Sequence, residues 1–186
     1  MTERRTVVLV DERGRVQGEA PKLDAHQPPG RLHLAFSVLL FRPDGRVLLQ
    51  RRAEAKYHFP GVWANACCSH PAPGEGVVAS AERRLVEELG LRCDLTEVGA
   101  FVYRARCEST GLVEHELDHV LVGTTTGEPS PDPGEVAETC WELPAGVLDG
   151  SFAGAGARKL APWLVPALSL VAARAEGPGR AGPGGR

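Results

Sequence analysis

The sequence predicts an α+β fold, in which a mixed β-sheet is layered with helices. Short apolar and β-branched runs separated by glycine and proline turns recur along most of the 186 residues. A helical pattern interrupts them in the middle, over residues 75–89, and again near the end, over residues 164–175. Strands in this order, with one central and one closing helix, are typical of a sheet covered by helices.

The first part of the chain is predicted to form four strands, of which residues 6–10 are the first. Residues 34–41 are almost continuously apolar, which is typical of a central strand buried on both faces. The turn at 42–45 has proline and glycine where a type I turn favours them, so residues 47–49 are expected to complete a hairpin. Residues 62–70 are the fourth strand candidate.

That fourth strand carries a thiol and an imidazole. Cys68 and His70 are two residues apart, so both side chains would leave the sheet on the same face. A thiol beside a metal-ligating residue type indicates a chemical site, with Cys67 pointing to the opposite face. The alternative is a half-buried strand end, because a free cysteine packs like a small hydrophobe.

The later part of the chain begins with the clearest helical signal. Residues 75–89 carry an apolar stripe at helical spacing, and Gly90 follows at the position of a C-terminal cap. Three strands are expected next, over residues 98–106, 112–122 and 139–143. The closing helix, residues 164–175, has Pro166 in its first turn, where proline is tolerated.

Length and composition predict one domain over residues 1–176, followed by a disordered Gly/Pro-rich tail over residues 177–186. The chain is 42% apolar and 24% charged with a net charge of −3, which argues against nucleic acid or a membrane surface as partner. No apolar run reaches the about 20 residues that a membrane span needs. Five cysteines without C-x-x-C spacing favour a reducing compartment, so we expect a cytoplasmic protein.

Metal-ligating residue types occur in three places along the chain. They are His26, His33, His70, Glu114 and Glu116. Three imidazoles and two carboxylates suit a divalent ion such as Mn²⁺, Mg²⁺ or Zn²⁺, with a position open for catalysis. The spacing leaves convergence open, since histidines near loops are often exposed and Glu114 with Glu116 also fits an outer strand face. His58, His115 and His119 rank below these five.

A second group of charges lies on the central helix. Arg84 and Glu88 are four residues apart, on one helical face. They fit either a surface ion pair or a diphosphate site, in which Glu88 holds Mg²⁺ and Arg84 meets phosphate oxygens. Lys22, Arg52 and Lys56 would add positive charge for the same anion, although each alone also fits a solvated surface position.

Taken together, these residues resemble the Nudix superfamily, whose box of glycine, glutamate and arginine residues matches residues 69–91. Glu75 and Arg83 stand at the first glutamate and the arginine of the box, and residues 87–91 complete it. Ser69 replaces the first glycine, and Arg84 replaces the first helical glutamate. An arginine at that position removes a Mg²⁺ ligand of the Nudix hydrolases, which argues against hydrolysis.

Within that superfamily the chain is similar to the type I isopentenyl-diphosphate delta-isomerases, over roughly residues 6–165. The matching segments are residues 31–37, 51–53, 60–71, 103–105, 113–116 and 162–163. The resemblance implies a Nudix-like mixed sheet layered with helices. It also implies an enzyme of isoprenoid biosynthesis, which interconverts isopentenyl and dimethylallyl diphosphate through a tertiary carbocation.

The resemblance to the isomerases also implies ligands and binding groups. One divalent ion, Mn²⁺, Mg²⁺ or Zn²⁺, would be held by His26, His33, His70, Glu114 and Glu116. A second ion, Mg²⁺ bridging the diphosphate, would be held by Glu88 and the main-chain carbonyl of Cys68. The cations that bind the diphosphate would be Lys22, Arg52, Lys56 and Arg84.

Four residues match the catalytic groups of the isomerases, namely Cys68, Tyr103, Glu116 and Trp163. Glu116, with Tyr103 as relay, is favoured as the acid and Cys68 as the base, with Trp163 beside the cation. One alternative is a Nudix diphosphohydrolase acting on a prenyl or nucleoside diphosphate. The other is a metal-dependent binding module without turnover, which would not need the catalytic set.

Overall fold

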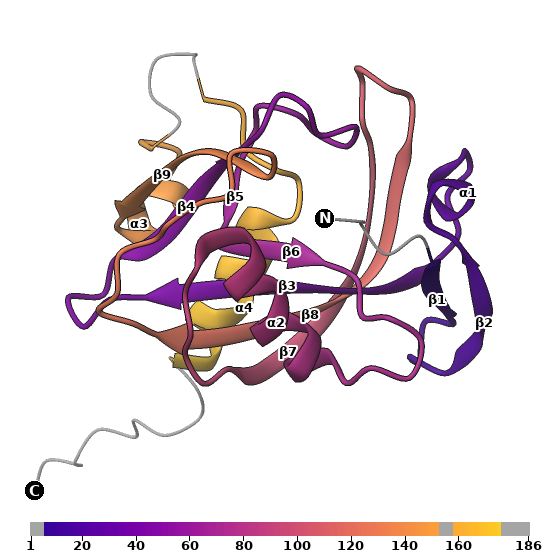
Figure 1. Cartoon of the computed structure of the whole chain (residues 1–186), viewed down its shortest axis with the longest axis horizontal. Coiled ribbons are helices and arrows are strands. Elements are labelled where there is room, and N and C mark those ends of the chain that lie inside the picture. Colours follow the sequence, from indigo (N-terminus) through magenta and orange to yellow (C-terminus); the bar gives the residue numbers. More distant parts are fainter. Residues whose placement is uncertain (1–5, 153–157, 176–186) are drawn as a thin grey trace, which may run out of the picture.

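The computed structural model describes residues 6–152 and 158–175 (Figure 1). The tail predicted over residues 177–186 lies outside the described residues. Within the described ranges the strands are β1 (Thr6–Val10), β2 (Val16–Pro21), β3 (His33–Phe41), β4 (Val47–Arg52), β5 (Trp63–Asn65), β6 (Cys67–Ser69), β7 (Thr96–Arg106), β8 (Val113–Thr124) and β9 (Val136–Glu142). The helices are α1 (Lys22–His26), α2 (Val77–Leu89), α3 (Pro144–Leu148) and α4 (Leu164–Ala175). The predicted α+β class is confirmed.

β3 is the central strand of one mixed sheet. It pairs antiparallel with β1, β4 and β6, and parallel with β8, which in turn pairs antiparallel with β7. β9 and β5 extend the sheet on β4, and β2 extends it on β1. The parallel β3–β8 pair joins residues of the early chain to residues about 80 positions later, with His33 opposite Glu116.

The sheet separates two apolar cores, each covered by one long helix. Leu39 of β3 faces the core of α4, which contains Leu164 and Leu168. Its neighbours Val38 and Leu40 face the core of α2. The two helices overlap in the view of Figure 1, and they lie on opposite faces of the sheet. The prediction that residues 34–41 are buried on both faces is therefore confirmed, because the side chains of a strand alternate between its faces.

The strand predicted over residues 62–70 is two strands in the structure. β5 pairs with β4, and β6 pairs with β3, so the chain changes partner at Ala66. The Asn65 side-chain amide makes this change possible, since its Nδ2 donates to the carbonyls of Val38 and Cys67 at 3.0 Å each. These side-chain bonds satisfy main-chain carbonyls that a continuous ladder would otherwise satisfy.

The predicted helix over residues 75–89 begins two residues later, at Val77. Gly76 is its extended N-cap, and the Glu75 carboxylate accepts hydrogen bonds from Arg83 and from the Ala72 N–H. Gly90 ends the helix in the left-handed conformation, with φ 66°, as its position predicted.

Three elements were not predicted, namely β2, α1 and α3. Two of them are five-residue helices, too short to show a helical period. Among the described residues, no helix has the length and apolar character needed to cross a membrane.

Candidate active site

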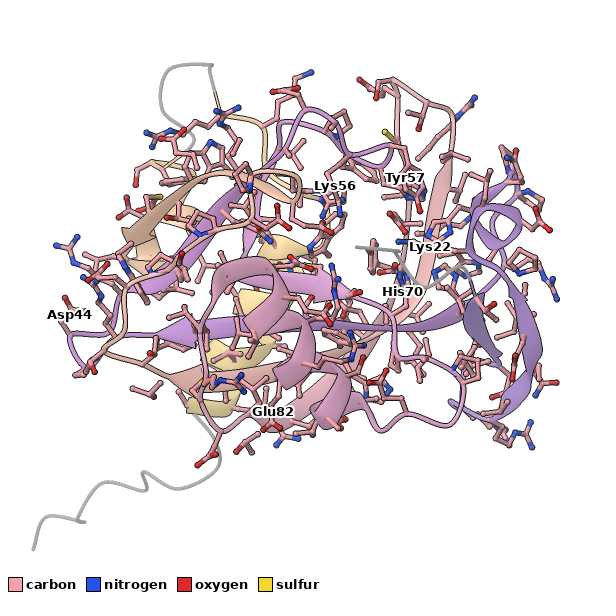
Figure 2. The ribbon with its side chains drawn as sticks, in the orientation of Figure 1. Lys22, Asp44, Lys56, Tyr57, His70 and Glu82 are labelled. Carbon is pink, nitrogen blue, oxygen red and sulfur yellow. The ribbon has the colours of Figure 1, made fainter. Side chains whose placement is uncertain are left out.

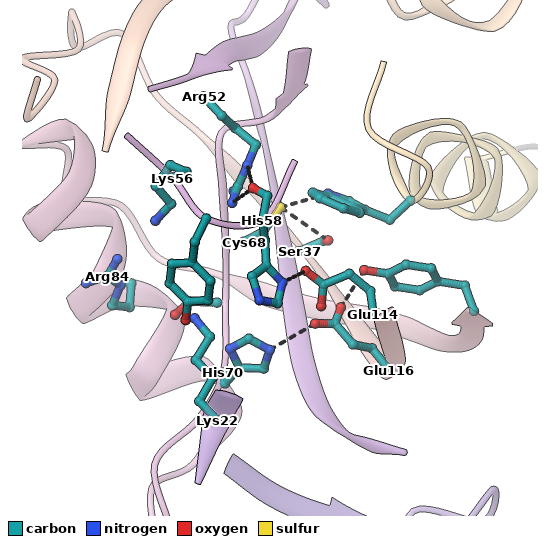
Figure 3. Close-up of a pocket in the computed structure, with 14 residues that line it drawn as sticks. Lys22, Ser37, Arg52, Lys56, His58, Cys68, His70, Arg84, Glu114 and Glu116 are labelled. Carbon is teal, nitrogen blue, oxygen red and sulfur yellow. Dashed lines mark hydrogen bonds and ion pairs between the residues drawn. The ribbon is translucent and has the colours of Figure 1, made fainter. Parts of the chain in front are cut away.

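A cavity lies where β3, β6 and β8 meet the segment between β4 and β5 (Figure 3). Side chains from distant parts of the chain line it: Lys22, Ser37, Arg52, Lys56, Tyr57, His58, Cys68, Ser69, His70, Arg84, Tyr103, Glu114, Glu116 and Trp163. Figure 2 shows Lys56 and Tyr57 on one side of this region, with Lys22 and His70 next to them. The cavity thus includes all four predicted catalytic residues and all four predicted diphosphate-binding cations.

Strand register places the reactive side chains in rows across the sheet. Glu116 on β8 lies opposite His33 on β3 and opposite Tyr103 on β7. The Tyr103 hydroxyl donates to Glu116 Oε2 at 2.6 Å. Four residues further along β3, Ser37 lies opposite Cys68 on β6. Because each partner is fixed by ladder hydrogen bonds, the rows are set by the fold rather than by flexible loops.

The five predicted metal-ligating residues converge. One ligand atom of each lies within 4.8 Å of those of all the others, and these residues are His26, His33, His70, Glu114 and Glu116. The convergence that spacing left open is therefore present. Glu114 and Glu116 are 6% and 7% exposed, so the alternative of an outer strand face is wrong.

The histidines of this cluster are oriented as metal ligands. Nδ1 of His26 lies 2.6 Å from the Lys22 carbonyl, and Nδ1 of His33 lies 2.8 Å from the Arg31 carbonyl. A carbonyl accepts only, so each ring carries its proton on Nδ1 and, when neutral, turns a lone pair on Nε2 inwards. The inner Nε2 of His33 also lies 3.1 Å from Nε2 of His70. Such inward lone pairs beside two carboxylates fit a divalent cation.

The charges of the cluster shift the pKa of several groups. Burial raises the pKa of Glu116, but the hydrogen bond and charge of His33 and the hydrogen bond from Tyr103 together lower it to about 2. Burial also raises the pKa of Glu114, and hydrogen bonds from His26 and His58 bring it down to about 2. Burial lowers the pKa of His70 well below its usual range, with Lys22 adding to the effect. The cluster therefore holds two ionised carboxylates beside a neutral His70.

Cys68 is surrounded by hydrogen-bonding groups. Its Sγ lies 3.0 Å from Asn65 Oδ1, 3.0 Å from the Trp163 indole nitrogen and 3.7 Å from Ser37 Oγ. Burial raises the pKa of the thiol, and the Asp118 carboxylate raises it further. Burial and the Asp118 carboxylate therefore favour the protonated form of the Cys68 thiol.

Cys67 has a different environment from its neighbour. It is fully buried and packs in the core beneath α2. The alternation of strand side chains predicted this separation, and it is confirmed.

The predicted diphosphate-binding cations surround the mouth of the cavity. Arg52 is buried, and it donates to the main-chain carbonyls of His58 and Phe59. Lys22 Nζ lies 5.5 Å from the centre of the Tyr57 ring. Lys56 forms an ion pair with Glu135. Arg52 is thus not the solvated surface charge that its position alone also allowed.

Arg84 already has acidic partners on α2 and beyond. Its guanidinium donates to Glu88 at 2.6 Å, to Glu87 at 2.8 Å and to Glu135 at 3.3 Å. Burial lowers the pKa of Arg84, but its neighbours, with Glu88 and Glu135 among them, together raise it above its usual value. Arg84 thus neutralises the carboxylates of Glu87, Glu88 and Glu135, which would otherwise be available to bind metal cations.

Three residues near the site were missed or ranked low by sequence reasoning. His58 donates a hydrogen bond to Glu114. Glu135 accepts hydrogen bonds from Lys56 and Arg84. Asp118 accepts a hydrogen bond from Ser37 at 2.7 Å. The i, i+2, i+4 spacing of Glu114, Glu116 and Asp118 on one strand face was the available signal for Asp118. No spacing signal pointed to Glu135, since its partners lie 51 and 79 residues away.

The other two low-ranked histidines lie outside the cluster. Nδ1 of His115 contacts the Gly30 carbonyl at 3.1 Å, and Nδ1 of His119 contacts Glu97 at 2.7 Å. Neither is among the residues that line the cavity.

Comparison with known proteins identifies the family. Residues 31–164 match the NUDIX domain family, which is well over half of the chain. The chain belongs to the NUDIX family. Its α2 and the preceding turn, residues 69–91, are the box of this NUDIX domain, with Arg84 at a position that the resemblance predicted to be glutamate.

Two curated relatives of this NUDIX protein have the same name. This chain is 55% identical over 175 residues to "Isopentenyl-diphosphate Delta-isomerase" of Nocardia farcinica, and the match covers 94% of this chain and 99% of the relative. This chain is 54% identical over 138 residues to the protein of the same name from Streptomyces coelicolor, and the match covers 74% of this chain and 70% of the relative. These matches place the NUDIX protein in the type I isomerase branch that the sequence motifs predicted.

Solved NUDIX-type structures share the fold. The DR0079 protein of Deinococcus radiodurans has a TM-score of 0.71 and 19% identity, covering 88% of this chain and 97% of its own. The MutT protein of Methanosarcina mazei Go1 has a TM-score of 0.60 and 17% identity, covering 74% of this chain and 91% of its own. At this identity the likeness concerns the fold alone, and it confirms the Nudix-like mixed sheet.

Proposed function

We propose that this NUDIX protein is an isopentenyl-diphosphate delta-isomerase, which interconverts isopentenyl and dimethylallyl diphosphate in isoprenoid biosynthesis. The observation that carries the proposal is one cavity with Cys68 on one strand and Glu116 with Tyr103 on two others, next to Trp163 and a five-ligand cluster. The shared name of relatives at 51–55% identity supports the same activity.

The His/Glu cluster binds a divalent metal, and we assign it Mn²⁺, Mg²⁺ or Zn²⁺ on the chemistry of its donors. The ion would neutralise negative charge at the cluster and polarise the Glu116 carboxylate. A second ion, Mg²⁺, is assigned to Glu88 and the main-chain carbonyl of Cys68, because Mg²⁺ prefers oxygen ligands. In the structure Glu88 is bonded to Arg84, so this proposal requires Arg84 to turn towards the phosphate oxygens.

Lys22, Arg52, Lys56 and Arg84 would hold the diphosphate at the mouth of the cavity. They converge from α1, β4, the following segment and α2, which supports a common anionic ligand. With the diphosphate fixed there, the hydrocarbon end of the substrate would reach Cys68, Glu116 and Trp163. The partner is thus a small diphosphate molecule.

The reaction requires two proton transfers and no redox change. A proton adds to the terminal methylene carbon, the π electrons form the new C–H bond, and a tertiary carbocation remains. A proton then leaves the carbon next to the diphosphate-bearing carbon, and its C–H electrons form the new double bond. We assign both transfers to Cys68 and Glu116, with the Tyr103 hydroxyl relaying protons to Glu116 at 2.6 Å.

Trp163 would stabilise the carbocation. It is 3% exposed, and its indole packs against Phe59 and Tyr103 with ring centres 5.5 and 5.9 Å apart. A cation over a desolvated indole face is stabilised by about 2 kcal/mol. Exclusion of water also protects the cation from capture by a hydroxide or water molecule.

The activity is tested by incubating the purified protein with isopentenyl diphosphate and Mg²⁺ in D₂O, with NMR detection of products. We expect dimethylallyl diphosphate labelled with deuterium, and loss of turnover when a chelator is added. Cys68→Ala and Glu116→Gln should each lower kcat by at least about 10³-fold while the fold persists, since general acid–base groups contribute about 10²–10⁴-fold. Cys140→Ser, which changes a cysteine on β9, is the control.

Two results would contradict the proposal. If either catalytic variant retained most of the wild-type rate, that residue's role would be wrong. Release of phosphate from prenyl or nucleoside diphosphates, without isomer, would instead support a diphosphohydrolase. Arg84 argues against this alternative, because it stands where the Nudix hydrolases have a glutamate that binds Mg²⁺.

We also propose that the protein works in the cytoplasm. All five cysteines are free thiols, and Cys68 has to stay reduced to transfer protons. A reducing compartment provides that condition.

A further inference from the structure

His58 is buried next to the metal cluster without belonging to it. It lies on the segment between β4 and β5 and is 4% exposed. Its Nδ1 is 2.6 Å from Oε1 of Glu114, while Oε2 of the same carboxylate is 2.8 Å from Nε2 of His26. Figure 3 shows this bond from His58 to Glu114 at the cavity wall. Both oxygens of Glu114 are therefore fixed, one from the cluster side and one from the segment.

The main chain around His58 is held in place from two directions. Arg52 donates to the His58 carbonyl through Nη2 at 2.9 Å and to the Phe59 carbonyl through Nε at 3.1 Å. The Phe59 N–H contacts Cys107 Sγ at 3.4 Å, and Phe59 has φ 43°, in the left-handed region that non-glycine residues rarely adopt. A strained conformation held by several bonds gives the His58 imidazole a fixed position.

The second ring nitrogen of His58, Nε2, has a different environment from Nδ1. Nε2 is buried and has no hydrogen-bond partner among the described residues. A buried nitrogen without a hydrogen-bond partner lowers the stability of the folded state. The contact of Nδ1 with Glu114 is thus the one polar side-chain bond of this imidazole in the described part of the chain.

We propose that His58 is a positioning residue that orients Glu114 for metal binding, by donating from Nδ1 to Oε1, the carboxylate oxygen other than the one that His26 contacts. The inference rests on the proposed role of the His/Glu cluster as a metal site. A hydrogen bond from a neighbouring group fixes the orientation of a ligating carboxylate and changes metal affinity by about 10–100-fold. His58 also joins the metal site to the segment that carries Lys56, a cation assigned to the diphosphate.

The test compares two substitutions that differ in one donor. His58→Leu keeps an apolar side chain of moderate size and removes the N–H, whereas His58→Asn keeps an N–H near the position of Nδ1. His119→Leu is the matched control, because it removes a histidine with a similar contact to Glu97, outside the cavity. Each full-length protein is stripped with a chelator, checked for its fold by circular dichroism, and titrated with Mn²⁺ by calorimetry without substrate.

We expect His58→Leu to weaken Mn²⁺ binding by about 10–100-fold. His58→Asn and His119→Leu should stay within about threefold of the wild type. The proposal is overturned if His58→Leu binds Mn²⁺ as tightly as the wild type, or if His58→Asn is as weak as His58→Leu.

A third outcome concerns direct ligation. The absorption spectrum of bound Co²⁺ should be the same in the wild type and in His58→Asn, because the ligands are unchanged. A shifted spectrum would make His58 itself a ligand and would contradict a positioning role. Since no substrate is present, absence of isomerase activity in the wild type would leave these comparisons valid and would count only against the proposed reaction.

Discussion

At the scale of single residues, Trp163 has two contacts that matter for the chemistry. Its indole N–H reaches both Cys68 Sγ at 3.0 Å and Asn65 Oδ1 at 3.1 Å. Asn65 in turn accepts from the Cys68 thiol and donates to two main-chain carbonyls. The residue that allows the strand break thus also fixes the thiol and the indole, so substitutions at Asn65 would change fold and chemistry together.

Trp163→Phe separates the two functions of the indole, because it keeps an aromatic face but removes the N–H. We expect kcat to fall about 30-fold with little change in KM, since a hydrogen bond and part of the cation–π attraction are lost, each worth about 1 kcal/mol. Steady-state kinetics checks this expectation. A kcat within twofold of the wild type would show that neither contact supports the reaction.

At the scale of elements, the segment before α2 is attached to the helix by charge. Glu75 accepts from Arg83 Nε at 2.9 Å and Nη2 at 3.1 Å, and also from the Ala72 N–H at 3.1 Å. These bonds, with Arg83 contributing most, lower the pKa of Glu75 from 4.5 to about 2. The bonds hold the chain between His70 and the start of α2, and therefore connect the two ends of the box.

Glu75→Gln should lower the stability of the fold in a pH-dependent way. A carboxylate with a depressed pKa stabilises the folded state above pH 4.5, and the effect is lost as the pH falls towards 2. After allowance for solvent screening, we expect a loss of about 1 kcal/mol at pH 7. Thermal melts at pH 7 and pH 3 measure it, with exposed Glu12→Gln as control. An equal difference in Tm at both pH values would exclude the ionised carboxylate as the cause.

At the scale of the whole molecule, the features of the fold that depend on local residue patterns could be predicted from the sequence. The two-sided burial of residues 34–41 and the separation of Cys67 from Cys68 follow from strand alternation, and both are confirmed. The convergence of the metal ligands depends on a parallel strand pair and on α1, which has too few residues for a period. His58 ranked low because no second likely ligand shares its face in the sequence, whereas its partner Glu114 is 56 residues away.

Metal binding should stabilise the whole fold, because the ligands come from α1, β3, β8 and the end of β6. At an ion concentration about 100 times Kd, the expected gain is about 2.7 kcal/mol. For a chain of this length that corresponds to a rise in Tm of roughly 5–10 °C. Differential scanning fluorimetry with Mn²⁺ and with chelator measures it. His26→Gln should show a much smaller shift, and an equal shift would place the ion elsewhere.

The parallel pairing of β3 with β8 also determines when the site can form during folding. His33 and Glu116 become neighbours only after the chain closes a loop of about 80 residues, and His26 and Glu114 are 88 positions apart. Closing such a loop costs entropy, which the contacts between the two strands have to overcome. Metal affinity in this protein therefore depends on the β3–β8 pair, and an ion added during refolding would bind chains in which this pair has formed.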